Sequence, residues 1–296
     1  YHGLPELDRS DIIPAKGGMD MYSVFELCPA AELSPYKTFE CGQCFRWNPD
    51  ENGDYIGVAS GRAARVFERD GKAFIECESA NIGFWREYLD MDTDYAAARR
   101  SIMLGEYLTE CAEYGEGIRI LRQDKWEALC SFIISQCNNI PRIKGIVEKL
   151  CGLFGEAFDT PWGEKHSFPT ASRVALLEEP ELAPLRSGYR AAYIISAARA
   201  VASGDIDLEY AASLNGNEAR KYLKGLNGVG DKVANCAVLF GLHRMDAFPV
   251  DVWIKRALKD HLPEGFDPSS LGEYAGLAQQ YMFFAERERS VRGQLT

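Results

Sequence analysis

The chain has 296 residues, of which 46% are hydrophobic, and its 33 basic and 44 acidic side chains give a formal net charge of -11. It has no run of 18 or more apolar residues, which excludes a membrane-spanning helix, and its acidic balance excludes a broadly basic coat for nucleic acid. The first residues, YHGLPELDRSDIIP, lack the basic stretch and apolar core of a secretory signal. The cysteines, nine in number and scattered singly, indicate reduced thiols, so we expect a cytosolic protein.

A local basic face is compatible with this net charge. Basic residues gather between positions 140 and 235, namely Arg142, Lys144, Lys149, Arg186, Arg190, Lys221, Lys224 and Lys232. The alternative is that they are solvated helix faces.

Residues 20 to about 80 alternate short β-rich runs with turn signals. The runs are MYSVFEL, CGQCFRW, DYIGVAS, RAARVFE and KAFIECE, and they are broken by Asn48-Pro49, Asn52-Gly53 and Asp70-Gly71. This pattern predicts an antiparallel sheet. Cys41 and Cys44 form a lone CxxC in the second run, and without a second pair at zinc spacing we interpret them as structural thiols.

From about Asn81 onward the hydrophobic residues recur at the spacing of an α-helix. After Asp124 one apolar stripe contains Trp126, Leu129, Cys130, Ile133 and Cys137, and further helices are predicted at 142–154, 190–203, 217–225, 231–242, 251–261 and 271–289. The predicted fold class is therefore α+β. An N-terminal antiparallel β-rich domain (1–120) precedes a helical domain (121–296) with a helix–hairpin–helix motif at about 217–242.

The hairpin itself lies in KYLKGLNGVGDKVANCAVLFG, residues 221–241. One helix ends near Leu226, and a second follows directly after Gly228, Val229 and Gly230. The glycines permit close backbone approach and positive φ, and the first turn of the new helix leaves amide N–H groups free for an anion. This arrangement is typical of a phosphate-binding device.

Lys232 lies in the first turn of that second helix, where the helix dipole disfavours a cation. A pocket there would favour the neutral amine, which can attack carbon, whereas the simpler alternative is an exposed lysine that touches a phosphate. Asp251, in FPVDVW, follows 19 residues later, so a single turnaround of the chain brings the two side chains near each other. Asp251 is also a candidate N-cap, and its carboxylate could stabilise positive charge on a sugar carbon.

These residues together resemble the helix-hairpin-helix DNA glycosylase superfamily, and within it the 8-oxoguanine DNA glycosylases with associated lyase activity. The resemblance runs from about Gly42 to Phe283. It implies that Lys232 is the nucleophile, that Asp251 assists it, and that duplex DNA containing oxidised guanine is the partner of a monomeric enzyme, cytoplasmic in a bacterium or nuclear in a eukaryote.

The resemblance also implies a base pocket. Cys236 and Phe283 would form its two sides, and Gln279 would bond the pairing edge of the flipped base. The Gly42 carbonyl would accept the N7 hydrogen that 8-oxoguanine has and guanine lacks. Four further residues would contact DNA around the gap and the abandoned cytosine, namely Asn138, Arg142, Tyr189 and Arg190. Taken singly, Phe283 could equally be plain core, and Gln279 and Asn138 plain surface.

Three positions depart from the family pattern. Cys137 stands where an Asn is usual, Asn227 replaces the hairpin proline, and Trp253 replaces a phosphate-binding histidine. No cysteine follows Cys236, so we expect no C-terminal iron–sulfur cluster. The chemistry needs no cofactor or catalytic metal, although a structural cation at the hairpin carbonyls is compatible with the family.

The predicted function is thus removal of 8-oxoguanine opposite cytosine by lysine Schiff-base chemistry with β-lyase activity. One alternative is a glycosylase of the same superfamily for another base, such as an alkylated purine or an oxidised pyrimidine. The more distant alternative is a noncatalytic DNA-binding module, in which Asp251 is only a cap.

Overall fold

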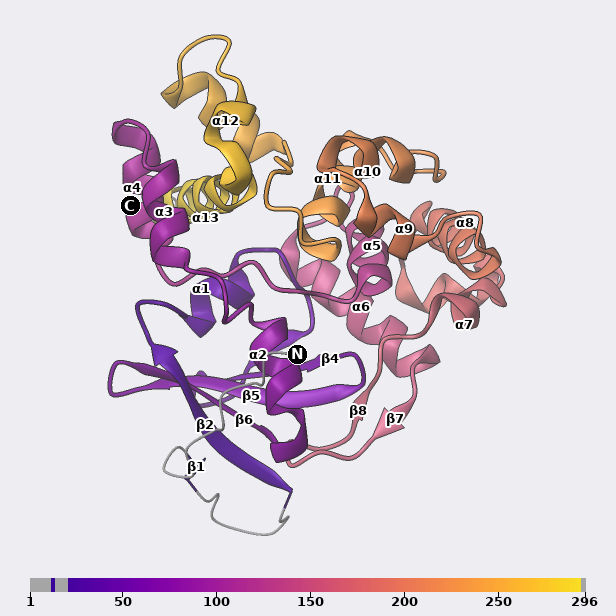
Figure 1. Cartoon of the computed structure of the whole chain (residues 1–296). Coiled ribbons are helices and arrows are strands. Elements are labelled where there is room, and N and C mark those ends of the chain that lie inside the picture. Colours follow the sequence, from indigo (N-terminus) through magenta and orange to yellow (C-terminus); the bar gives the residue numbers. More distant parts are fainter. Residues whose placement is uncertain (1–11, 14–20, 294–296) are drawn as a thin grey trace.

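The computed structural model describes residues 12–13 and 21–293. Its N-terminal part is built on a six-stranded antiparallel sheet (Figure 1). Its strands are β1 (Ile12–Ile13), β2 (Tyr22–Pro29), β3 (Trp47–Pro49), β4 (Tyr55–Ala59), β5 (Arg62–Arg69) and β6 (Lys72–Glu78), in the order β1-β2-β6-β5-β4-β3. The turn between β5 and β6 is Asp70-Gly71, and both residues have positive φ. The predicted antiparallel sheet and the α+β class are confirmed. Residues 1–11 and 14–20, which include most of the stretch examined for a secretory signal, lie outside the described part.

One predicted strand is wrong. CGQCFRW is not extended: helix α1 (Pro35–Glu40) precedes it, a bent segment follows, and only Trp47 belongs to a strand. Gly42 has φ of +80°, which interrupts a strand. The Gln43 side chain, which is fully buried, donates to the carbonyls of Thr38 and Arg119 and accepts from the Leu121 N–H. Side-chain bonds from distant residues thus replace the ladder bonds that a strand would make.

Helices form most of the rest of the fold, and most of them stand above the sheet in Figure 1, whereas α2 lies against it. They are α2 (Ile82–Tyr88), α3 (Tyr95–Ile102), α4 (Glu106–Tyr114), α5 (Lys125–Ile134), α6 (Ile140–Phe154), α7 (Ala171–Ala175), α8 (Arg190–Ser203), α9 (Leu208–Ser213), α10 (Gly216–Leu223), α11 (Asp231–Cys236), α12 (Val252–His261) and α13 (Ala275–Gly293). Shorter elements are the 3-10 helices η2 (Ser79–Asn81), η3 (Glu179–Leu185) and η5 (Pro268–Tyr274) and the π-helix η4 (Ala237–Gly241). Strands β7 (Ala157–Phe158) and β8 (Lys165–His166) form a small hairpin. None of the described helices is both long and apolar enough to cross a membrane.

The apolar stripe predicted after Asp124 is shorter than expected. Asp124 caps α5 by accepting from the Glu127 N–H, and the helix ends at Ile134. Cys137 lies beyond that end, is exposed and has φ of +51°, so its place in the buried stripe is wrong. The reversal of the chain there leads directly into α6, which Asn139 caps.

Two hydrophobic cores hold the chain together. One lies between the sheet and α2 and includes Trp47, Trp85 and Val66. The larger one gathers the helices and also includes Tyr95 and Leu108 from α3 and α4, which pack against the C-terminal helix α13. The segment before residue 120 therefore contributes to both cores, and the domain boundary at that residue stays a prediction.

Candidate active site

A cavity of about 1000 Å³ opens among α5, α6, α11, α12, α13 and the segment after α1. It brings together residues that lie far apart in the sequence. The predicted site residues that line it are Gly42, Asn138, Lys232, Cys236, Asp251, Gln279 and Phe283. The other predicted DNA contacts, Arg142, Tyr189, Arg190, Gly228, Val229 and Gly230, are not among its lining residues.

The hairpin places Lys232 at the cavity. Helix α10 begins with a capping box between Asn215 and Glu218, and after its end Val229 N–H donates to the Leu226 carbonyl at 3.1 Å. Gly228 has φ of +79°, and a Cβ there would lie 2.3 Å from the Tyr193 ring, so both the backbone angle and the close packing require glycine. Gly230 is the N-cap of α11. The turn therefore has the predicted form.

The amine of Lys232 is half-buried and points to α5. Its Nζ donates to Ser135 Oγ at 3.1 Å and lies 5.4 Å from the centroid of the Phe132 ring. The Ser135 hydroxyl donates in turn to the Phe132 carbonyl at 2.7 Å, so it presents its oxygen to the amine. Cys236 lies one turn further along, and burial raises the pKa of its thiol while Lys232 acts in the opposite direction. Lys232 is therefore a pocket residue and not a surface lysine.

Asp251 caps α12 and also lines the cavity. Its Oδ1 accepts from the N–H groups of Trp253 at 3.0 Å and Ile254 at 2.9 Å. The cap therefore uses one carboxylate oxygen, and Oδ2 is the oxygen that a ligand would meet. Both expected roles, the cap and the pocket carboxylate, are compatible with this geometry. Trp253 also lines the cavity, and the Arg256 guanidinium lies 5.4 Å from its ring.

The wall formed by Gly42 and α13 is closely packed. A Cβ on Gly42 would lie 3.2 Å from Ile140 Cδ1 and 3.3 Å from Phe283 Cε1. Gln279, one turn before Phe283, is 4% exposed, and its Oε1 has no hydrogen-bond partner among the described residues. A buried unpaired acceptor in a cavity is costly unless a ligand satisfies it. Gln279 is thus well suited to bind a polar ligand.

Further predicted contacts lie in or beside the loop between α5 and α6. Arg190 is 5% exposed and donates to the carbonyls of Gln136 and Ser187, so it holds this loop from α8. Asn138 donates to the Ile134 carbonyl at 2.8 Å. Tyr189 is 54% exposed, and a hydrogen bond with Cys137 raises its pKa. The predicted roles of these residues toward DNA stay predictions.

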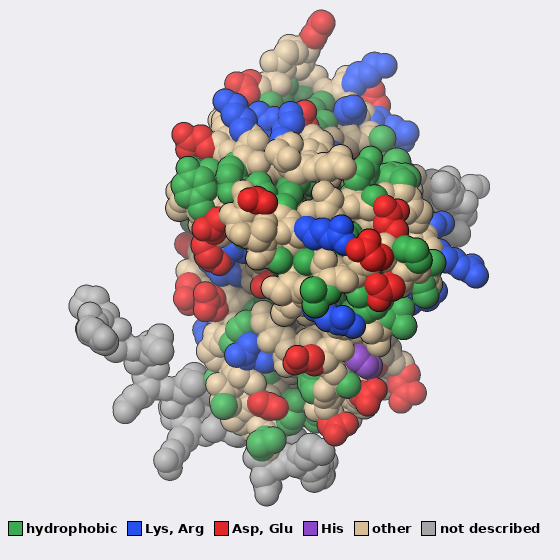
Figure 2. Space-filling model, turned by 90° about the vertical axis from the view of Figure 1, so that its right-hand side faces the viewer, with side chains coloured by type: hydrophobic (Ala, Val, Ile, Leu, Met, Phe, Trp, Pro, Cys, Tyr) green, Lys and Arg blue, Asp and Glu red, His purple; other side chains and the backbone are tan. Residues whose placement is uncertain are grey.

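The charged surface around these elements is mixed. Arg142 is exposed and reaches the Arg186 carbonyl at 3.3 Å, whereas Lys144 and Arg190 are turned to internal partners. On the face shown in Figure 2, basic and acidic side chains are interspersed. Any phosphate contact on that face therefore rests on individual side chains and backbone amides.

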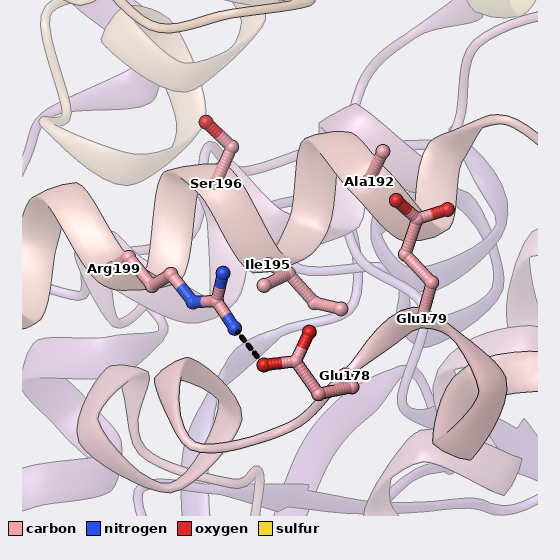
Figure 3. A pocket seen from close by; sticks show the side chains of 6 residues that line it. All are labelled: Glu178, Glu179, Ala192, Ile195, Ser196 and Arg199. Atoms are coloured by element: carbon pink, nitrogen blue, oxygen red, sulfur yellow. Dashed lines mark hydrogen bonds and ion pairs between the residues drawn. The ribbon is translucent and has the colours of Figure 1, made fainter.

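A second, smaller cavity lies between η3 and α8 (Figure 3). It measures about 220 Å³ and contains the ion pair between Glu178 and Arg199 at 2.7 Å. None of the residues predicted for the site lines it.

The sequence reasoning missed two pocket residues. Ser135, the partner of the Lys232 amine, follows three residues after Phe132, and this helical spacing was the available signal. Lys144, which bonds Glu40 and the Trp47 carbonyl, had no local signal because its partners lie about a hundred positions away.

The geometry defines a class of protein: a helix–hairpin–helix protein that presents a half-buried lysine amine and an aspartate in one cavity. Two family descriptions match the chain. The 8-oxoguanine DNA glycosylase N-terminal domain matches residues 27–129, and the HhH-GPD superfamily of base excision DNA repair proteins matches residues 130–268.

Individual proteins agree with these families. A "Probable N-glycosylase/DNA lyase" from Methanothermobacter thermautotrophicus is 30% identical over 64% of this chain and 69% of its own length. A yeast "N-glycosylase/DNA lyase" from Saccharomyces cerevisiae is 42% identical over 156 residues, but the match spans only 42% of that protein. A Clostridium acetobutylicum 8-oxoguanine glycosylase/lyase, solved in complex with duplex DNA containing cytosine opposite 8-oxoguanine, is 32% identical, with a TM-score of 0.84 over 94% of this chain and 98% of that chain. The chain therefore belongs to the HhH-GPD superfamily of base excision DNA repair proteins, with the N-terminal domain of its 8-oxoguanine glycosylases.

Proposed function

We propose that the protein excises 8-oxoguanine from duplex DNA, opposite cytosine, and then nicks the strand as a β-lyase. The observation that carries the proposal is that the Lys232 amine and the Asp251 carboxylate line the same cavity as Gly42, Gln279 and Phe283. The first two are suited to reaction at a sugar, and the other three are suited to hold a purine.

The lesion would leave the helix and enter the cavity at an unstacking cost of a few kcal/mol. Phe283 would stack on one face of the base and Cys236 would pack on the other. The orphaned Oε1 of Gln279 would accept from the pairing edge of the base, while the Gly42 carbonyl would accept the N7 hydrogen of 8-oxoguanine. Guanine would present a lone pair to that carbonyl and bind less well.

The Lys232 Nζ would then attack C1′ as a neutral amine. A bond forms between Nζ and C1′, the bond between C1′ and N9 breaks, and the base departs with that electron pair and a proton. The Asp251 carboxylate stabilises the positive charge that develops on the sugar. Ring opening gives a Schiff base, and loss of a proton from C2′ expels the 3′ phosphate by β-elimination.

No step of this scheme passes through a cofactor. A structural cation at the hairpin carbonyls, the monomeric state and the cytoplasmic or nuclear location stay predictions.

Borohydride trapping tests the proposal. The protein is incubated with duplexes that contain 8-oxoguanine or intact guanine opposite cytosine, or an alkylated purine or an oxidised pyrimidine opposite its ordinary partner base, and borohydride is added. We expect a covalent adduct and a free base with 8-oxoguanine above all others. Preferential trapping on the alkylated purine or the oxidised pyrimidine would mean that this lesion, and not 8-oxoguanine, is the substrate. Absence of any adduct, with equal binding to lesion and intact duplex, would leave only the DNA-binding alternative.

The opposite base is tested in the same assay. Duplexes with 8-oxoguanine opposite each of the four bases are compared, and we expect the highest excision opposite cytosine. Equal excision opposite all four bases would show that the loop containing Cys137 does not read the opposite strand.

A further inference from the structure

The bent segment of residues 40–47, called here the Gly42 segment, is held through its carbonyls. Side chains from distant elements bind them: Arg287 the Glu40 carbonyl, Gln280 the Cys41 carbonyl at 2.5 Å, Gln123 the Gln43 carbonyl at 2.8 Å, and Lys144 the Trp47 carbonyl at 2.8 Å. Among the described residues, no donor is bonded to the Gly42 carbonyl itself. The carbonyl that the proposed function needs is thus left for a ligand, while carbonyls on both sides of it are fixed.

Lys144 has a special place in this arrangement because it joins the two ends of the segment. Its Nζ donates to Glu40 Oε1 at 2.8 Å and to the Trp47 carbonyl, also at 2.8 Å. The Lys144 side chain is 14% exposed and that of Glu40 is 23% exposed, so water competes only weakly for this ion pair. Both residues line the cavity.

The helix that carries Lys144 also touches Gly42 directly. Ile140 lies one turn earlier on the same face of α6, and its Cδ1 is the atom nearest to the position of a Gly42 Cβ. Helix α6 therefore sets the position of the segment at its middle, through Ile140, and at both ends, through Lys144.

From this geometry we propose that Lys144 and Glu40 are positioning residues that hold the Gly42 carbonyl where it selects the lesion. The inference rests on the proposed function. The groups that act on the sugar, Lys232 and Asp251, belong to α11 and the start of α12, so loosening the Gly42 segment should impair recognition of the base more than reaction at C1′. An abasic site has no base to recognise, so its nicking should depend least on this ion pair.

Two variants test the role, Lys144→Met and Glu40→Gln, with Lys149→Met as the matched control on an exposed position of α6. Each is assayed for release of 8-oxoguanine from a duplex opposite cytosine, and for nicking of a duplex with a preformed abasic site. Because a displacement of about 1 Å in a site can cost up to about 100-fold, we expect kcat/KM for base release to fall by about tenfold or more relative to nicking in Lys144→Met. Glu40→Gln should show a smaller fall in the same ratio, since it keeps the bond to the Trp47 carbonyl, and Lys149→Met should show none.

An equal fall in both reactions would overturn the inference, because it would show a general structural role or a direct role of the Lys144 amine in the chemistry. No fall in either reaction would overturn it as well. If Lys144→Met melts below the assay temperature, Glu40→Gln alone decides.

A binding measurement separates this inference from the proposed function. In the Lys232→Gln background, affinities for 8-oxoguanine and guanine duplexes are compared with and without Lys144→Met. Equal affinity for both duplexes before the second substitution would contradict the proposed function. A preference for 8-oxoguanine that Lys144→Met leaves intact would contradict only the role of Lys144.

Discussion

The two segments that carry the proposed nucleophile and the proposed base-selecting carbonyl are held in different ways. The hairpin that presents Lys232 is shaped mainly by neighbours in the sequence, namely a capping box, a glycine turn and the start of the next helix, and Gly228 of the turn also packs against Tyr193 of α8. The Gly42 segment is fixed by side chains from α6, α13 and the stretch around Gln123. Under the proposed function, the chemistry would thus depend largely on a local motif, whereas the choice of base would depend on side chains from distant parts of the chain.

The largest effect should follow from removal of the nucleophile. In Lys232→Gln we expect base release and borohydride trapping to fall by about a thousandfold or more, since no other group replaces an amine in Schiff-base chemistry. Binding to the lesion duplex, measured by a gel-shift titration, should change little. Lys149→Gln is the control. An adduct that persists in Lys232→Gln would point to Lys144 or Lys255, the other amines that line the cavity.

A substitution in the glycine turn of the hairpin should have the second largest effect. Gly228→Ala places a Cβ 2.3 Å from the Tyr193 ring at a positive φ, so we expect a loss of about 2–4 kcal/mol in the free energy of unfolding. Gly163→Ala is the matched control, because Gly163 also has positive φ, +86°, but has nothing within 4 Å of the added Cβ. Urea denaturation of both variants measures the difference. Similar losses in the two would mean that the close contact with Tyr193 does not constrain the turn.

Two substitutions of Asp251 separate its role as a helix cap from its role as a negatively charged pocket residue. Asn is as good an N-cap as Asp, so Asp251→Asn should unfold within a few tenths of a kcal/mol of the natural protein, yet release 8-oxoguanine about 10- to 100-fold more slowly, because the charge near the sugar is lost. Asp251→Ala should lose the cap as well, at about 1 kcal/mol. Single-turnover base release and thermal melting check the two effects. If Asp251→Asn kept full activity, the residue would be only a cap.

The same contrast explains what the sequence could predict. The strand Lys72–Glu78, the helix Arg190–Ser203 and the hairpin were predictable because period, caps and glycines are local signals. CGQCFRW was predicted as a strand because its residues favour one, whereas its real shape depends on Gln43, Arg119 and Leu121, which come together only in the folded chain. Cys137 was misplaced because the apolar spacing of α5 continues as far as this residue, whereas the signals that follow it, the cap Asn139 and Pro141, mark the start of α6 and not the end of α5. The residues of the cavity were predicted through family resemblance, and Lys144, which the resemblance does not include, was missed.

The smallest predicted effect concerns pH and the core beneath the Gly42 segment. Burial raises the pKa of Glu127 on α5 from 4.5 to about 7, with Asp124 and Glu148 adding to the rise and Arg46 opposing it. Between these values the unfolded chain has released the proton while the folded protein still binds it, so unfolding releases a proton and stability falls as pH rises from about 4.5 to about 7, then levels off. Glu127→Gln should remove this fall, which we expect to be about 2 kcal/mol, whereas the exposed control Glu113→Gln should keep it. Urea denaturation at pH 5 and pH 8 measures the slope. Arg46 lies in the Gly42 segment, one residue before its end, and its charge acts on Glu127. Base release in the natural protein should therefore respond more strongly to the change from pH 5 to pH 8 than nicking at an abasic site does. Equal sensitivity of the two reactions would argue that the core under the segment does not reach the base pocket.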